Sequence, residues 1–87
     1  MKVVVTTQFR GVFWGELTDN NAPASVELAE YRNCIYWNKT MNGFVGLSTY
    51  GPDAECKIGA KGSKITLYGI TAILDCSAAA SEKWIAA

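Results

Sequence analysis

Apolar and polar residues alternate along the first part of the chain, a period of two that is typical of β-strands with one buried face. Residues 2–8 (KVVVTTQ) are rich in β-branched side chains and have no helix former at the central positions, so we predict a strand there. The next segment, residues 12–18 (VFWGELT), divides into two faces, with Phe13, Gly15 and Leu17 on one and Val12, Trp14 and Glu16 on the other. Arg10-Gly11 provides a turn between the two segments, and together they are predicted to form a β-hairpin.

An internal repeat predicts the conformation of two later segments. Residues 25–38 (SVELAEYRNCIYWN) follow a predicted loop at residues 19–23, and their first half has helix propensity. The apolar positions of this segment recur 39 residues later: Val26, Leu28, Tyr31, Cys34 and Ile35 return as Ile65, Leu67, Ile70, Ile73 and Leu74. The second copy is rich in β-branched residues and carries Gly69 in the middle of the run, which indicates a strand, a bend and a second strand. We expect the same conformation in the first copy.

The segment between the two copies, residues 38–63, has no sustained period and is predicted to be a long loop. Within it we expect one helical turn at residues 43–50 and a short strand around residues 55–58. Its apolar content favours an ordered loop over disorder. At the end of the chain, Ser77 is a helix cap, and the alanine-rich residues 77–86 are predicted to form a short helix that turns Trp84 inward.

These elements predict a mainly β protein, with residues 1–87 forming a single domain. The expected architecture is a small antiparallel barrel or curled sheet of five to six strands over residues 2–76, with a loop at 38–63 and a C-terminal helix at 77–86. A core of this size is only marginally sufficient for stability. The chain has ten aromatic residues, more than so small a domain can bury, and we therefore expect a homo-oligomer in which some of them lie at a subunit interface.

The charges balance overall but are unevenly distributed. Eight basic and eight acidic residues cancel, which argues against a general polyanion binder. The residues from 57 to 64 nevertheless carry three lysines, Lys57, Lys61 and Lys64, with no acidic residue among them. One region can therefore hold an anion while the molecule as a whole stays neutral.

The cysteines and the ends of the chain give no sign of a disulfide framework, a metal site or a membrane segment. Cys34, Cys56 and Cys76 are odd in number, widely spaced and without a Cys-x-x-Cys pair, so we expect buried reduced thiols and no metal or cofactor. The apolar run near the start is too short for a signal peptide or a membrane span. We expect a cytoplasmic protein without membrane contact.

Residues 57–70 (KIGAKGSKITLYGI) raise the question of a phosphate site. The Gly59-Ala60-Lys61-Gly62 spacing matches a G-x-x-G loop that clamps a nucleic-acid backbone when it joins two helices, but here a predicted strand follows directly. No Walker loop can be aligned with it. Glycines nevertheless let backbone N–H groups approach an anion, and Lys57, Lys61 and Lys64 supply charge. The alternative is a solvated turn guarded by lysines before an apolar strand.

Four further residues are candidate ligand contacts, and each segment that carries them also has a structural interpretation. Trp37 and Asn38 end a predicted strand with a stacking surface and an amide, which suits a nucleobase. The alternative is that one of Tyr36 and Trp37, which lie on opposite faces of the strand, packs in the core and the other packs at an interface. Tyr50 begins a turn and either closes over a ligand or covers the end of the barrel. Arg32 is a possible bidentate phosphate ligand, with Glu27 and Glu30 as alternative structural partners.

Catalysis has little support in the sequence. The chain has no histidine, which removes the commonest general base. There is no G-x-S-x-G motif, and no cysteine has a histidine to activate it. We expect a protein that is not an enzyme and has no catalytic residues.

Residues 11–37 (GVFWGELTDNNAPASVELAEYRNCIYW) resemble part of an Sm-like barrel, with a glycine-bearing bent strand, an acidic turn and a V-x-L strand. This resemblance implies a small β barrel that binds single-stranded RNA or DNA. The second Sm signature requires a basic residue and glycine after an isoleucine, whereas Ile70 is followed by Thr71 and Ala72. Nucleic-acid binding is therefore kept as an alternative function.

Over its whole length the chain resembles small single-domain bacteriophage and prophage proteins of unknown function. The opening MKVVVTTQFRGVFWGEL, the central IYWN, the GFVGLSTYGP segment and the closing ITLYGITAILDCS carry this resemblance. It implies a phage origin and a small accessory role, and by analogy the sequestration of a small nucleotide-like immune signal in the host cytoplasm. Together with the lysine cluster and the aromatic excess, this favours seven ligand contacts: Arg32, Trp37, Asn38, Tyr50, Lys57, Lys61 and Lys64. A protein-interaction role or a minor virion component is the other alternative.

Overall fold

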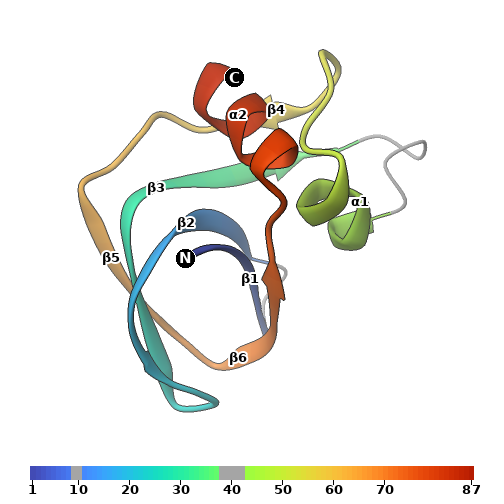
Figure 1. Cartoon of the computed structure of the whole chain (residues 1–87). Coiled ribbons are helices and arrows are strands. Elements are labelled where there is room, and N and C mark those ends of the chain that lie inside the picture. Colours follow the sequence, from blue (N-terminus) through green and yellow to red (C-terminus); the bar gives the residue numbers. More distant parts are fainter. Residues whose placement is uncertain (9–10, 38–42) are drawn as a thin grey trace.

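The structure, a computed structural model of the chain, describes residues 1–8, 11–37 and 43–87. Its elements are β1 (Lys2–Thr7), β2 (Val12–Asn21), β3 (Ser25–Tyr36), α1 (Gly43–Thr49), β4 (Lys57–Ile58), β5 (Lys64–Tyr68), β6 (Ile70–Asp75) and α2 (Ala78–Ala86). The strands form one antiparallel sheet in the order β4-β3-β2-β1-β6, and β5 pairs with the first half of β3. Figure 1 shows that this sheet curls on itself without closing and that both helices lie at one end of the curl. The predicted fold class, mainly β with a curled sheet and a short C-terminal helix, is confirmed.

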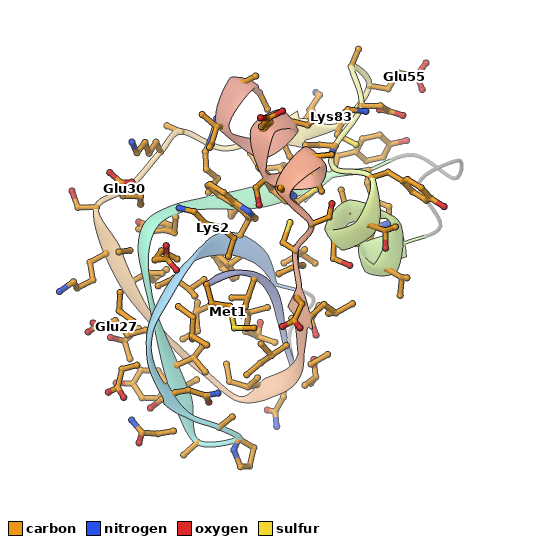
Figure 2. All side chains as sticks on the ribbon, viewed as in Figure 1. Met1, Lys2, Glu27, Glu30, Glu55 and Lys83 are labelled. Atoms are coloured by element: carbon orange, nitrogen blue, oxygen red, sulfur yellow. The ribbon has the colours of Figure 1, made fainter. Side chains whose placement is uncertain are left out.

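The strand alternation predicted from the sequence separates two hydrophobic cores. Val3 and Val5 belong to the inner core inside the curl, which also contains buried residues of β3 and β5: Val26, Leu28 and Leu67. Val4 lies on the other face, in the helix-side core with Val12, Trp14, Cys34, Leu47 and Trp84. The predicted division of β2 is confirmed, because Phe13 and Leu17 pack on the inner core while Val12 and Trp14 belong to the helix-side core. Figure 2 shows side chains filling the inside of the curl.

Both copies of the sequence repeat are bent strands. The backbone of Glu30 has φ 51° in the middle of β3, and Gly69, 39 residues later, has φ 65° between β5 and β6. The first halves of the two copies pair with each other, with Val26 opposite Leu67 and Leu28 opposite Ile65. The register is centred on the equivalent residues Glu27 and Thr66, so each apolar residue of one copy faces the other apolar position of the second copy. The strand–bend–strand conformation predicted for both copies is confirmed.

The predicted loop at residues 19–23 is wrong in its position. β2 continues to Asn21, where Asp19, Asn20 and Asn21 face Glu27, Val26 and Ser25 across the β2–β3 ladder. The turn is formed by residues 22–24 and contains a cis bond between Ala22 and Pro23. A side chain that favours turns still makes a local hydrogen bond, since Asn20 Oδ1 accepts from the Ala22 N–H at 3.0 Å. The backbone of residues 19–21 is nevertheless held in the extended strand by its pairing with β3.

The segment predicted to be a long loop contains regular structure where it is described. α1 spans Gly43–Thr49, which confirms the predicted helical turn, and β4 is limited to Lys57–Ile58 where we predict residues 55–58. Residues 38–42 lie outside the described part. At the end of the chain, Ser77 accepts a hydrogen bond from Ala80 N at 3.0 Å and caps α2, and Trp84 is fully buried, as predicted. Neither described helix is long and apolar enough to cross a membrane.

Candidate functional site: a basic cavity beside helix α2

Three cations from separate parts of the chain line one cavity of about 250 Å³, which we call the basic cavity. Its lining residues are Lys2, Trp14, Glu30, Arg32, Lys61 and Ile85. Trp14 and Arg32 are opposite each other in the β2–β3 register, and Lys2 lies on the next strand. Figure 2 shows Lys2 on the side of the sheet that carries α2. The sheet register and the end of α2 therefore bring these residues together.

Lys61 reaches the cavity because the glycines on either side of it run close to β3. Gly59 N donates to Asn33 O at 2.8 Å, and Gly62 N donates to Tyr31 O at 2.9 Å. A Cβ atom at Gly62 would collide with the Tyr31 ring, and one at Gly59 would collide with the Asn33 side chain. The glycines thus allow a close approach between backbones, and their N–H groups are occupied by β3 carbonyls. The charge that faces the cavity is that of Lys61.

Arg32 joins three segments through its guanidinium group. Its Nε donates to Gly59 O at 2.9 Å, and its Nη1 donates to Trp84 O at 2.9 Å and to Ile85 O at 3.4 Å. A cation at the carboxyl end of α2 is favoured by the helix dipole. Neither Glu27 nor Glu30, the structural partners considered from the sequence, pairs with Arg32 among the described interactions. Nη2 makes no hydrogen bond to a described residue, so this part of the guanidinium retains donor capacity.

Lys2 covers the Trp14 ring and pairs with a neighbouring carboxylate. Its Nζ lies 5.1 Å from the ring centroid and 3.7 Å from Glu16 Oε1. The amino group of Met1 bonds to the other oxygen, Glu16 Oε2. The Met1 hydrogen bond is the main reason why the pKa of Glu16 lies below its ordinary value, against a smaller opposing effect of desolvation. Both carboxylate oxygens of Glu16 therefore have a cationic partner, Met1 on one side and Lys2 on the other.

The lining of the basic cavity carries more positive than negative charge. Lys2, Arg32 and Lys61 face one carboxylate, Glu30, which lies 3.4 Å from Lys61 Nζ. An adjoining cavity of about 450 Å³, lined by Glu30, Lys61, Gly62 and Ser63, continues from the same lysine. The arrangement suits an anion, since an exposed lysine–glutamate pair contributes little stability and can be exchanged for a stronger acceptor.

Of the residues predicted from the sequence, the structure brings Arg32 and Lys61 together and places the others elsewhere. Lys64 Nζ lies 3.7 Å from Glu27 Oε1, and Lys57 is exposed on β4 opposite Tyr36. Tyr50 follows α1 with 63% of its surface exposed. Asn38 lies outside the described residues.

Trp37 lines a different and larger cavity, of about 610 Å³, which we call the Trp37 cavity. Its walls are formed by Thr6, Thr7, Gln8, Gly11, Val12, Trp37, Thr71 and Ala72. Lys2 lines the basic cavity and Thr7 lines the Trp37 cavity, and these residues are the first and the last of β1. At about 3.3 Å per residue, the strand separates the two residues by roughly 16 Å. Stacking on Trp37 and contact with Arg32 and Lys61 therefore belong to two separate sites within one chain.

The thiols give no support to a nucleophile. All three cysteines are free. Burial, with a smaller electrostatic effect of the neighbouring Cys56, raises the pKa of Cys34 from 9.0 to about 12. Burial also raises the pKa of Cys76. A thiol that stays protonated at neutral pH is a poor nucleophile and a poor metal ligand. Among residues 1–8, 11–37 and 43–87, no group of three or more potential metal ligands comes together.

Three lining residues of the basic cavity, Lys2, Trp14 and Ile85, are missing from the sequence-based candidates, and Glu30 is considered there only as a structural partner of Arg32. The alternation that assigns Trp14 and Glu16 to one face of β2 also predicts Lys2 on that face once the hairpin register is fixed. The contribution of Ile85 depends on how α2 docks, which no local pattern indicates.

The comparison with known families covers nearly the whole chain. A model described as Domain of unknown function (DUF6948) matches residues 1–84. The chain belongs to the DUF6948 family. Membership confirms the expected uncharacterised domain family, and the match spans all of the sheet together with α2 as far as Trp84. No curated protein and no solved structure matches the chain.

Proposed function

We propose that this DUF6948 protein binds a small phosphate-bearing, nucleotide-like ligand in the basic cavity and does not alter it chemically. The observation that carries the proposal is the convergence of Lys2, Arg32 and Lys61 on one cavity with an excess of positive charge. Two of these cations belong to flexible lysines that adapt to a phosphate, and the third is a planar guanidinium that matches its geometry.

The size of the basic cavity favours a phosphate group over a whole nucleotide. About 250 Å³ is slightly below the range of roughly 300–1,000 Å³ typical of pockets that enclose a complete small molecule. The adjoining cavity at Lys61, Gly62 and Ser63 adds about 450 Å³ along the surface. In this proposal the phosphate lies among the cations and the remainder of the ligand extends over residues 61–63.

The existing ion pairs are weak competitors for such a ligand. The side chains of Lys61 and Glu30 are 61% and 62% exposed, and exposed pairs of this kind contribute about 0–1 kcal/mol. A hydrogen bond to a charged group contributes about 1.5–3 kcal/mol. Because the Lys61–Glu30 pair is weak, a phosphate oxygen can replace Glu30 at Lys61 at little cost, whereas Arg32 keeps its bonds to the end of α2.

The biological role in this proposal is sequestration. The resemblance to bacteriophage and prophage proteins supports an accessory protein that withdraws a nucleotide-like immune signal in the host cytoplasm. The absence of histidine and the protonated thiols are consistent with binding without chemistry.

The proposal includes a homo-oligomer. Several large apolar residues are more than half exposed: Ile35 at 65%, Tyr36 at 52%, Tyr50 at 63% and Tyr68 at 71%. Exposed apolar surface of this kind supports an interface between copies. Sedimentation equilibrium at micromolar concentration is expected to give a mass above that of one chain, and a monomer would contradict this part of the proposal.

Two experiments test the binding itself. Calorimetric titration with inorganic pyrophosphate, cyclic dinucleotides and ADP-ribose is expected to give saturable heat with at least one of them, weakening as salt increases. Mass spectrometry of small molecules released by heating the purified protein is expected to show a phosphate-bearing compound. Absence of heat with every compound, together with absence of a released phosphate, would exclude the proposed function.

A further inference from the structure

The Trp37 cavity lies at the opposite end of β1 from the basic cavity and collects its walls from three strands. Thr6 and Thr7 come from the end of β1, Val12 from the start of β2, and Thr71 and Ala72 from β6. Trp37, which follows β3, contributes the aromatic surface and is half-buried against the helix-side core. The ring is therefore held in place by packing while it borders the cavity. The volume of the Trp37 cavity, about 610 Å³, lies well within the range of small-molecule sites.

The polar groups of the cavity are few and differ in availability. Thr6 Oγ1 and Thr71 Oγ1 lie 2.6 Å apart and bond to each other, and Thr6 is buried. Thr71 and Gln8 are exposed and retain further hydrogen-bonding capacity. A Cβ atom at Gly11 would collide with the Thr7 hydroxyl and with the Phe13 ring. Glycine at this position therefore allows the Thr7 side chain to line the cavity. The described lining residues include no charged side chain.

From these features we propose that the Trp37 cavity binds an uncharged, flat heterocycle with hydrogen-bonding edges, a free nucleobase or a nucleoside. The indole of Trp37 offers a stacking surface, and the Gln8 amide and Thr71 hydroxyl offer donors and acceptors to the edge of the ring. The site is separate from the basic cavity and does not rest on the function proposed for that cavity.

The wall chemistry distinguishes this ligand class from two others. A sugar carries hydroxyl groups on every side and needs more polar partners than one amide and a few threonines, two of which already bond to each other. A phosphate or carboxylate ligand would find no opposite charge among the described lining residues. A neutral heterocycle needs a flat apolar surface and a small number of edge contacts, which the cavity supplies.

Calorimetry and NMR on the full chain test the inference with adenosine, guanosine, cytidine and uridine as probes. We expect saturable binding of at least one nucleoside, with shifts of the Trp37 indole signal, and no binding of ribose at the same concentrations. Thr71→Val is expected to weaken binding about fivefold through loss of one hydrogen bond. The matched control is Thr66→Val, an exposed strand threonine on β5 outside the cavity, which is expected to leave affinity unchanged.

Three further variants extend the test. Trp37→Leu is expected to weaken binding about tenfold or more by removing the stacking surface. If this variant does not fold, Gln8→Ala, at an exposed position, tests the same site with an expected loss of about fivefold. Lys61→Gln is expected to leave nucleoside binding unchanged, which separates this site from the basic cavity.

The inference is overturned if none of the four nucleosides shifts the Trp37 signal at millimolar concentration. It is also overturned if Thr71→Val and Thr66→Val weaken binding equally. Binding of ribose alone with the same affinity as the nucleosides would assign the cavity to a sugar and would equally contradict it.

Discussion

The indole rings of Trp14 and Trp84 are stacked, with their centroids 6.1 Å apart and their planes within 6° of parallel. Trp14 belongs to β2 and Trp84 to α2, so this contact joins the sheet to the C-terminal helix. Both indole N–H groups are satisfied, Trp14 by Ser81 Oγ at 3.3 Å and Trp84 by Leu47 O at 3.0 Å. The second bond also fixes α1, and the helix-side core therefore unites both helices with the sheet.

Replacement of Trp84 by alanine is expected to lower the free energy of unfolding by about 3–5 kcal/mol. The substitution removes a fully buried ring and leaves the Leu47 carbonyl without its donor. Chemical denaturation followed by circular dichroism measures the change. Ile85→Ala, at the next position of the same helix but 62% exposed, is the matched control and is expected to change stability by less than about 1 kcal/mol. Equal losses in the two variants would contradict the assigned core.

Gly51 is predicted to be far less replaceable than Gly43. Both glycines have positive φ, 82° and 68°. A Cβ atom at Gly51 would lie 2.8 Å from Ala80 O and 2.9 Å from Lys83 Cβ, whereas no atom of the described residues lies within 4 Å of one at Gly43. Gly43→Ala is expected to cost about 1–2 kcal/mol through backbone strain alone. Gly51→Ala adds a collision with α2 and is expected to cost more, as thermal unfolding of both variants would show.

The Cys34 thiol is predicted to make the protein less stable at alkaline pH. Burial raises the pKa of Cys34 in the folded chain to about 12, against 9.0 when the thiol is unperturbed. Above about pH 9 the unfolded chain releases this proton while the folded chain keeps it, so the free energy of unfolding falls as pH rises towards 12. Below the unfolded pKa the contribution is constant. Urea denaturation from about pH 8 to about pH 10 measures the decline.

Cys34→Ala is the control for the alkaline effect, because other groups also titrate in this range. The variant is expected to lose less stability than the natural chain between about pH 8 and about pH 10. Alkylation with iodoacetamide, mapped by mass spectrometry, is expected to modify Cys34 slowly in the folded protein and rapidly in urea. Fast labelling of Cys34 under native conditions would show that its burial is not as described.

Much of the fold follows from local patterns in the sequence. The alternation in residues 12–18 predicts which side chains of β2 enter each core, and the repeat predicts the bends at Glu30 and Gly69. The loop at residues 19–23 is misplaced because the side chains of Asp19, Asn20 and Asn21 favour turns, while the ladder with β3 holds their backbone extended. Turn propensity is local, and pairing with a neighbouring strand outweighs it.

The candidate site is less predictable because it depends on which segments meet. The lysine excess in residues 57–64 includes Lys61, which lines the basic cavity, but the number of lysines cannot separate it from Lys64, which pairs with Glu27. Arg32, a candidate because of its residue type, also lines the cavity, but its partners are backbone carbonyls of α2 and of Gly59 and not the expected carboxylates. Lys2 joins the site only through the β1–β2 register.

The central claim, that Lys61 acts in an anion site while Lys64 does not, is tested most directly by comparing Lys61→Gln with Lys64→Gln. The two lysines are closely matched, with side chains 61% and 62% exposed and one glutamate partner each, at 3.4 Å and 3.7 Å. Only Lys61 is among the residues that line the basic cavity. Calorimetric titration with pyrophosphate, or with the phosphate-bearing compound released on heating, is predicted to show about tenfold weaker binding for Lys61→Gln and unchanged binding for Lys64→Gln. Equal affinities in the two variants would contradict the claim.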